Sequence, residues 1–359
     1  MKGEDMPEND KIKSLHLENF TVFEKADFEF CPGINVLIGA NGTGKTHVMK
    51  ISYGLLELCY YIQKKSVEPI NFIGDIFQQT SLESLNRISG QAALAKLKYA
   101  ATKTELEIFP KNKKPDTISG ISGTDPAPKS CFIPAQEFLS INKGFRSTYE
   151  NREIPYDRTY YDLSLALDTL PLRREKLTGV KDILDLLGNI LAGKDAESGD
   201  VVSQEGGQFY LNLPEGRLDA PLVADGYRKL ATLYYLLRNG SLTKNSVLFW
   251  DEPEANLNPK LIVETVRVLK MMAALGMQIF VATHDYLLSH ELSLMAEYPS
   301  DADIDIRFFA LHKPDRTAGV QVESGRTLAE IENNPILEEF AAHYDRESAL
   351  FHQSEGQDE

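Results

Sequence analysis

The chain has 359 residues, of which 42% are apolar and 25% charged, an ordinary balance for a folded globular protein. Its 53 acidic residues outnumber 38 Lys and Arg, and the net charge of −15 argues against a protein that coats nucleic acid over its whole surface. The three cysteines, Cys31, Cys59 and Cys131, are widely separated, which argues against a disulfide framework or a zinc site.

No apolar run reaches the ~18 residues that a membrane-spanning helix needs. The first residues, MKGEDMPENDK, are acidic and polar, whereas a signal peptide begins with a basic and then an apolar stretch. We therefore expect a soluble, cytoplasmic protein that has no membrane partner. The first ten residues and Gln353–Glu359 are polar, and we expect both ends to be disordered.

The N-terminal third begins with strand patterns. Alternating apolar residues around Leu15–Leu17 and Phe28–Phe30 predict two strands, and the apolar run Ile34–Ile38 predicts a buried third. His47–Ile62 carries a helical pattern. From 63 to 130 short helical and strand pieces alternate with turns, and we interpret this segment as an insertion in the domain.

In the remaining two thirds of the chain, the predicted secondary structure changes twice. Residues 142–199 have helical patterns and predict a helical lobe. From Leu222 to His284 the chain alternates helices with buried strands. Ile304–His312 and Gly319–Glu323 predict two closing strands, followed by a helix over Leu328–Tyr344.

A glycine-rich segment, Gly39–Thr46, fits the phosphate-binding pattern G-x-x-x-x-G-K-[ST] between a strand and a helix. Backbone N–H groups of such a loop converge on phosphate oxygens, together with the positive end of the helix. We predict that Lys45 pairs with the β- and γ-phosphates of ATP and that the Thr46 hydroxyl binds Mg²⁺. The other loop residues expected to contact the nucleotide are Asn41, Gly42, Thr43 and Gly44.

A second apolar run, Ser246–Trp250, ends in two acidic residues. In a chain with a phosphate-binding loop this is the Walker B position, where Asp251 would hold Mg²⁺ through water. Glu252 stands where a general base can polarise the attacking water. Two acids at a strand end are also ordinary turn formers, but the sequence Trp-Asp-Glu-Pro after a buried strand argues against that reading.

One histidine ends the next strand. Gln278–Thr283 is apolar enough to be buried, and His284 follows it directly. A histidine beside the γ-phosphate can sense the nucleotide and hold the water and Glu252 in place. A lone histidine is more often structural, but its Val-Ala-Thr-His-Asp setting favours the switch role.

Together these segments resemble the RecF/SMC/OLD branch of ABC ATPases: Glu18-Asn19-Phe20, the GANGTGKT loop, LFWDEPEANLNP and VATHD. The resemblance implies an α/β fold, a P-loop NTPase head of ABC-ATPase type with a mixed sheet core and an inserted helical lobe. In that branch two heads sandwich two ATP molecules, and the signature segment of each head contacts the nucleotide held by the other. It therefore also implies a homodimer or higher homo-oligomer with ATP and Mg²⁺ as cofactors.

The signature segment of that branch matches Val223–Lys229, at a helix start before the Walker B strand. The usual Leu-Ser-Gly-Gly-Gln has a serine where this chain has Ala224, so one hydroxyl to the partner's phosphate is missing. Gly226 and the helix N-terminus remain, and Arg228 or Lys229 could supply positive charge. The departure affects the expected turnover rate more than the expected ATP binding.

Two further positions of the branch have candidates here. Ala255–Asn258 occupies the D-loop, with Asn258 where an aspartate is commoner. Gln136, after the strand predicted at Cys131–Pro134, is a candidate for the Q-loop glutamine that contacts Mg²⁺ and relays to the helical lobe. An ordinary surface glutamine is the alternative.

The segments ADGYRKLA, IPAQEFLSI and DEPEANLNPKLI are similar to stand-alone OLD-like bacterial ATPases, including PtuA and AriA of anti-phage systems. The part after His284 is too short for a Toprim nuclease domain, and no heptad run predicts SMC-type arms. The resemblance implies an ATP-gated sensor or scaffold that controls a separately encoded effector, a nuclease or toxin, in anti-phage defence. We expect no nuclease activity from the chain itself.

A RecF-like DNA-repair ATPase that binds DNA directly is the alternative. The acidic charge argues against it, whereas Arg173–Arg174 and the Lys111–Lys114 cluster keep DNA binding possible, although such lysines are more typical of a solvated face. A transporter subunit is disfavoured by the long insertions and the altered signature.

We divide the chain into an N-terminal core with the P-loop (11–62), an insertion (63–130), the Q-loop region and helical lobe (131–205), a C-terminal core (206–325) and a terminal helix with a tail (326–359).

Overall fold

The computed structural model describes residues 11–64, 68–100, 102–110, 113–120, 128–193, 200–298, 304–315 and 317–355. The first ten residues, which we expected to be disordered, lie outside these ranges, as do residues 356–359. Residues 353–355 of the expected tail belong instead to the last helix.

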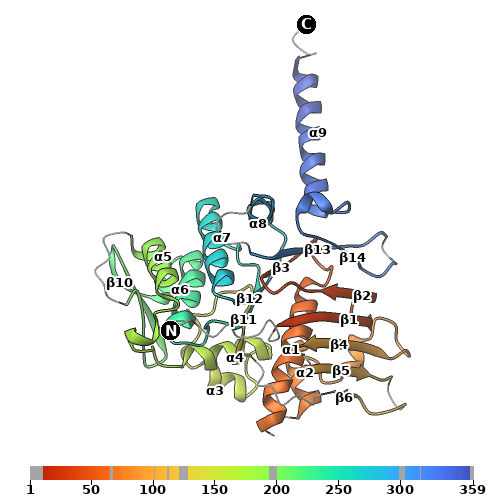
Figure 1. Ribbon diagram of the computed structural model, residues 1–359, viewed down its shortest axis with the longest axis horizontal. Helices are drawn as coiled ribbons and strands as arrows, with labels where there is room; N and C mark the ends of the chain where they lie inside the picture. The colour runs from red at the N-terminus through yellow and green to blue at the C-terminus, as the bar shows by residue number, and fades with distance from the viewer. Residues whose placement is uncertain are drawn as a thin grey trace, which may run out of the picture.

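A six-stranded sheet forms the centre of the molecule (Figure 1). Its order is β14-β13-β3-β12-β11-β7, and every neighbouring pair is parallel except β13 with β14. The strands are β3 (Ile34–Gly39), β7 (Ser130–Ile133), β11 (Val247–Asp251), β12 (Gln278–Thr283), β13 (Ile306–His312) and β14 (Gln321–Gly325). β3, β11 and β12 are buried along their whole length, which explains their continuous apolar sequences.

A second sheet of five antiparallel strands has the order β2-β1-β4-β5-β6. It consists of β1 (Ile12–Phe20), β2 (Phe23–Glu29), β4 (Ala93–Tyr99), β5 (Thr102–Ile108) and β6 (Thr117–Ser119). The predicted first two strands are confirmed. The segment that we interpreted as an insertion supplies three strands of this sheet, because β4 pairs with β1 from Ile12↔Tyr99 to Glu18↔Leu94.

Helix α1 (Lys45–Lys64) contacts strands of both sheets, β4 and β5 on one side and β12, β7 and β11 on the other. Its apolar side chains, among them Val48, Ile51 and Leu55, are fully buried in the core between the sheets. Because α1 begins at the P-loop lysine, this packing holds the loop at the end of β3. The helix α2 (Pro69–Phe77) packs beside α1.

The opposite side of the central sheet carries helices and a lobe (Figure 1). The helices are α6 (Asp225–Arg238), α7 (Pro259–Ala274) and α8 (Tyr286–Glu297). The lobe contains α3 (Phe145–Glu150), α4 (Arg158–Leu167), α5 (Lys181–Ala192) and a sheet of β8 (Val202–Glu205), β9 (Gln208–Leu213) and β10 (Gly216–Asp219). β8 packs on α6 and β9 on α5. β9 and β10, which we placed in the C-terminal core, thus join β8 of the predicted lobe in one sheet.

Polar contacts join the lobe to the P-loop helix. Lys50 of α1 forms an ion pair of 2.7 Å with Asp157, the N-cap residue of α4. The Tyr53 hydroxyl donates to Asp162 over 2.9 Å. A movement of α4 relative to α1 would break these contacts, so the lobe and the P-loop helix are mechanically linked.

The C-terminal helix α9 spans Pro335–Glu355, so the predicted start at Leu328 is wrong. Leu328–Glu330 forms a 3₁₀ turn. The long helix begins later because Pro335 suits a first helical position and the Asn334 side chain accepts from the Ile336 N–H over 3.1 Å. α9 projects away from the head (Figure 1) and exposes Tyr344. Within the described ranges, no helix is long and apolar enough to cross a membrane.

Candidate nucleotide site

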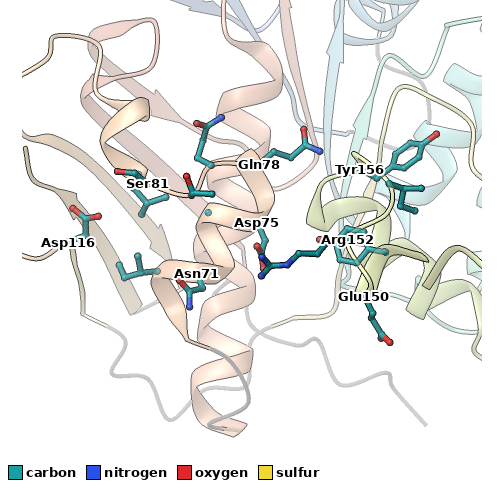
Figure 2. Close-up of a pocket in the computed structure, with 15 residues that line it drawn as sticks. Asn71, Asp75, Gln78, Ser81, Asp116, Glu150, Arg152 and Tyr156 are labelled. Atoms are coloured by element: carbon teal, nitrogen blue, oxygen red, sulfur yellow. The ribbon is translucent and has the colours of Figure 1, made fainter. Parts of the chain in front are cut away.

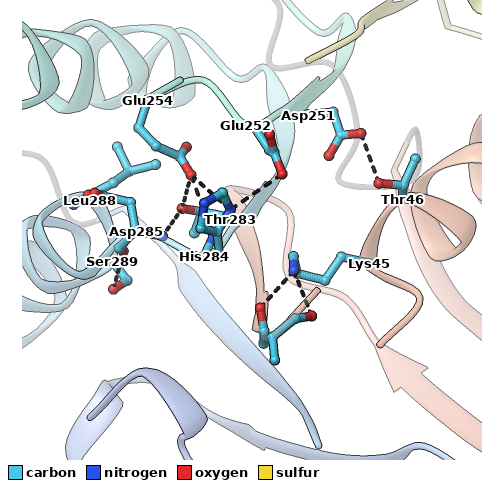
Figure 3. Close-up of polar contacts among 12 residues, drawn as sticks. Lys45, Thr46, Asp251, Glu252, Glu254, Thr283, His284, Asp285, Leu288 and Ser289 are labelled. Atoms are coloured by element: carbon cyan, nitrogen blue, oxygen red, sulfur yellow. Dashed lines mark hydrogen bonds and ion pairs between the residues drawn. The ribbon is translucent and has the colours of Figure 1, made fainter. Parts of the chain in front are cut away.

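The P-loop has the backbone conformation that its glycines allow. Gly44 has a φ of +91°, and a Cβ there would lie 2.6 Å from Val22 and 2.9 Å from Phe23, so a larger residue would be strained. Lys45 is buried, and its Nζ donates to the carbonyl oxygens of Gly39 (2.7 Å) and Ala40 (3.1 Å) (Figure 3). Thr43 is buried, whereas Asn41 and Gly42 are exposed. The loop therefore presents its outer turn to solvent above a buried ammonium group.

Thr46 and Asp251 meet where the P-loop and β11 end. The Thr46 hydroxyl donates to Asp251 Oδ2 over 2.9 Å (Figure 3). Burial raises the pKa of Asp251 to about 6, with the Thr46 hydrogen bond acting in the opposite direction. Asp251 Oδ1 is buried and has no hydrogen-bond partner among the described residues. A buried carboxylate with an unpartnered oxygen beside a hydroxyl suits a divalent cation.

The protein supplies few ligands for such a cation. In the described ranges no three His, Cys, Asp or Glu side chains gather closely enough to hold a metal ion. Mg²⁺ is commonly bound by one or two carboxylates together with phosphate oxygens of the substrate. Thr46 and Asp251 therefore fit a magnesium ion that arrives with a nucleotide.

Asp251→Asn is expected to raise the metal-free stability of the protein at pH 7. The folded-state pKa of Asp251 lies above its usual value of 3.8, so ionisation costs stability as the pH rises from about 4 to about 6. The gain should reach at most about 3 kcal/mol. Thermal unfolding with a chelator measures it, and the gain should vanish near pH 4. A stability difference that does not change with pH would contradict this account of Asp251.

Glu252 and His284 lie at the same edge of the central sheet. Glu252 Oε1 is 3.3 Å from His284 Nδ1, and both side chains are partly accessible (Figure 3). Glu252 has a φ of +46°, in the left-handed region that non-glycine residues rarely adopt. This strained backbone directs the Glu252 carboxylate toward the histidine.

Glu254, which the sequence did not single out, supports this pair. It is buried, and its Oε1 accepts from the Thr283 hydroxyl over 2.6 Å and from the His284 N–H over 3.4 Å. Burial raises the pKa of Glu254, and the Thr283 hydrogen bond opposes this shift. Glu254 could have been noticed in the sequence because it belongs to the Asp-Glu-Pro-Glu segment. That segment does not indicate, however, that Glu254 contacts the end of β12.

The signature segment begins helix α6. Ala224 is the exposed N-cap residue and has no side-chain cap. A Cβ on Gly226 would lie 2.8 Å from the Asn256 carbonyl oxygen, so glycine permits close packing of α6 on the D-loop. Asn258 caps α7 by accepting from the Leu261 N–H over 3.0 Å.

Arg228 points into the head. It is buried and forms ion pairs with Glu137 (2.9 Å) and Asp225 (2.5 Å), and it donates to the Val223 carbonyl. In this conformation its charge is engaged within its own chain. The contact between Arg228 and a partner's phosphate therefore stays a prediction that requires these ion pairs to rearrange.

Gln136 follows β7, the strand beside β11, and so lies at the same edge of the sheet as Asp251. Its side chain is exposed, and its amide donates to the Tyr156 hydroxyl over 3.5 Å. The structure thus brings Lys45, Thr46, Asp251 and the Glu252–His284 pair together. For Gln136, the contact with Mg²⁺ remains a prediction.

A hollow of about 760 Å³ lies elsewhere, between α2 and the segment that contains α3 (Figure 2). Its lining includes the charged residues Asp75, Asp116, Glu150 and Arg152. None of the predicted site residues lines it. The predicted nucleotide-binding residues therefore lie at the edge of the central sheet, away from this hollow.

Comparison with known proteins extends these observations. A family model described as "AAA domain, putative AbiEii toxin, Type IV TA system" matches residues 133–289, and a second AAA domain model matches residues 14–53. The matched segments contain the P-loop, the signature, the Walker B strand and the strand-terminal histidine. These two segments of the chain are similar to AAA-type ATPase domains. Residues 54–132, which lie between the two matched segments, contain α2 and β4–β6 of the fold.

Short segments of the chain are also similar to proteins described as DNA replication and repair protein RecF. RecF of Streptococcus uberis is 39% identical over 83 residues, which cover 23% of this chain and 22% of that protein. RecF of Staphylococcus haemolyticus is 42% identical over 45 residues, 12% of each chain. The aligned segments therefore span less than a quarter of these relatives.

Among solved structures, the Smc head domain of Pyrococcus furiosus, bound to the C-terminal domain of ScpA, is similar with a TM-score of 0.50. The identity is 11%, and the alignment covers 92% of this chain and 99% of that one. This likeness confirms the predicted fold, a P-loop NTPase head of ABC-ATPase type. The relation to the RecF and SMC branch is supported, and the narrower resemblance to OLD-like anti-phage ATPases stays a prediction.

Proposed function

We propose that the protein binds ATP with Mg²⁺ and hydrolyses it to ADP and phosphate at the edge of the central sheet. The observation that carries this proposal is the 2.9 Å hydrogen bond from Thr46 to Asp251, two residues 205 positions apart. The two halves of a P-loop ATPase site meet at this contact. A phosphate-release assay with the purified chain, with and without Mg²⁺, tests the proposal.

The side chains suggest how the site acts. Lys45 exchanges its two carbonyl acceptors for oxygens of the β- and γ-phosphates. Thr46 and Asp251 would hold the magnesium ion, which neutralises charge on the phosphate oxygens. Glu252 accepts a proton from the attacking water while His284 orients the Glu252 carboxylate. The water oxygen bonds to the γ-phosphorus, the bond to the bridging oxygen breaks, and ADP leaves.

We further propose that two copies close over the nucleotides. The outer turn of the P-loop at Asn41–Gly42 is exposed, as is the start of the signature helix at Ala224–Asp225. Leu222, just before that helix, is also exposed, with 73% of its surface accessible. Because Ala224 has no hydroxyl and Arg228 is paired internally, we assign the contact with the partner's nucleotide to the backbone N–H groups at the start of α6.

For the biological role, we propose an ATP-gated sensor or scaffold that controls a separate nuclease or toxin. The resemblance to OLD-like anti-phage ATPases supports this role. The description of the matched family, which names a putative AbiEii toxin of a type IV system, also points to toxin-based systems. A nuclease or toxin gene next to this one would identify the effector.

Direct DNA binding in the manner of a RecF-like repair protein is the second candidate, and the RecF sequence matches favour it. Of the basic residues that suggested it, Lys111 and the Arg174 side chain lie outside the described residues. The structure describes Lys113, Lys114 and Arg173, and their side chains are exposed.

For the sensor role we expect the purified chain neither to cut duplex DNA nor to bind it tightly at physiological salt. Binding through basic residues would weaken in proportion to log salt, with a slope of about −0.9 for each phosphate contacted. Fluorescence anisotropy with a labelled duplex at several salt concentrations measures this slope, and a gel assay detects cleavage. Strong salt-dependent binding that Lys113→Ala and Lys114→Ala reduce would favour the RecF-like role.

A further inference from the structure

Lys229, on the second turn of the signature helix, is one of the largest fully buried side chains of the described fold, with 2% exposure. Lysine is rarely buried, because removing an ammonium group from water costs several kcal/mol unless partners compensate. Burial lowers the pKa of Lys229, and the nearby carboxylates of Glu254 and Glu252 oppose that shift. An unbranched apolar residue could fill this space, so the charge calls for an explanation.

The Lys229 ammonium group is directed at the backbone of the proposed general base. Its Nζ donates to the Glu252 carbonyl oxygen over 2.8 Å, and no other acceptor for it occurs in the described part of the chain. The same carbonyl accepts from the Ala255 N–H over 3.1 Å, while the Glu252 N–H donates to Ala282 of β12 over 2.9 Å. Glu252 is therefore held on both sides of its Cα.

Glu252, the residue anchored in this way, also has a strained backbone conformation. Glu252 is the residue whose φ of +46° is unfavourable for a side chain with a Cβ. Such conformations cost about 1–3 kcal/mol and persist only where the surroundings impose them. With both of its backbone polar groups engaged, Glu252 keeps this conformation, which places its carboxylate 3.3 Å from His284 Nδ1.

Lys229 also connects two parts of the site. It lies on α6, whose first residues include Asp225, 3.3 Å from the Asn256 side chain of the D-loop. A displacement of the start of α6 would therefore be transmitted to the Glu252 carbonyl through the Lys229 side chain.

We propose that Lys229 is a positioning residue that holds Glu252 in its left-handed backbone conformation and thereby couples the signature helix to the general base. This inference rests on the proposed function, in which Glu252 is the base and the start of α6 meets the nucleotide of a second copy. It assigns Lys229 a role within its own head rather than on the partner's phosphate.

The test compares Lys229→Met, which fills the space without a donor, with Lys229→Gln, which keeps a donor without the charge. Lys229→Met should lower kcat about 10- to 100-fold, because a small displacement of a catalytic group has effects of that size. The Kd for ATP should change less than about threefold, since the residue does not touch the nucleotide. Lys229→Gln should retain more activity than Lys229→Met. Lys244→Met, which removes an exposed lysine, is the matched control and should behave as the unaltered protein.

A double-mutant cycle separates positioning from structural support. In a Glu252→Gln background, Lys229→Met should lower the residual turnover no further, because its effect passes through Glu252. A further loss equal to that of the single variant would overturn the inference, as would an unchanged kcat. Failure of both Lys229 variants to fold would also overturn it, by making Lys229 a structural residue. If Glu252→Gln itself keeps full turnover, the proposed function fails instead.

Discussion

Glu252→Gln is expected to lower the rate of ATP hydrolysis by about 10²- to 10⁴-fold, the usual contribution of a general base. The amide cannot accept the proton of the attacking water, but it has nearly the same shape as the carboxylate. ATP binding should therefore be retained. Single-turnover phosphate release measures the chemical step without a contribution from product release.

The same variant should also stabilise the closed dimer. If ATP binds and is not consumed, two copies should remain together around the nucleotides. Light scattering after size exclusion, with ATP and Mg²⁺ present, should then show twice the mass of the nucleotide-free protein. Glu215→Gln, in the exposed turn between β9 and β10, is the matched control and should change neither property. Unchanged turnover in Glu252→Gln would remove Glu252 as the base.

Lys45→Ala is expected to weaken ATP binding by about 10²- to 10³-fold, because it removes charge-assisted hydrogen bonds to two phosphates. Lys45 is 7% exposed and donates to two P-loop carbonyls, so it is already held at the centre of the loop. Isothermal titration calorimetry measures the affinity, with Lys244→Ala as the control for the loss of a lysine.

Thermal unfolding tests separately whether the Lys45→Ala protein remains folded. Alanine leaves the Gly39 and Ala40 carbonyls without their donor. Ala40 is exposed, so water can replace the ammonium at its carbonyl oxygen, and only the buried Gly39 carbonyl is left without a partner. The thermal unfolding midpoint should therefore stay within a few degrees of the original. Retained ATP affinity in a folded Lys45→Ala protein would exclude Gly39–Thr46 as the phosphate site.

The local parts of the site could be read from the sequence because short-range rules govern them. The Gly39–Thr46 loop needs glycines at defined positions between a strand and a helix, and the structure has that arrangement. β11 and β12 were recognisable because strands covered on both faces are apolar throughout. Asp251 and His284 follow directly from where those strands end.

The antiparallel sheet could not be read in the same way. β4 pairs with β1 across more than seventy intervening positions, and alternating residues at Ala93–Tyr99 fit a strand without naming its neighbour. We therefore interpreted residues 63–130 as an insertion. The pairing depends on how α1 packs between the two sheets, which is a property of the whole fold.

The sequence by itself determined the chemistry available to this protein: a P-loop lysine and threonine, two acids after a buried strand, and a histidine after the next. The tertiary structure alone decided the directions of the side chains on α6. Arg228 and Lys229 are neighbours that both suggested positive charge for a partner's phosphate. Arg228 pairs with Glu137, whereas Lys229 reaches the Glu252 carbonyl. Helical periodicity orders residues around a helix, but only packing decides which face meets which partner.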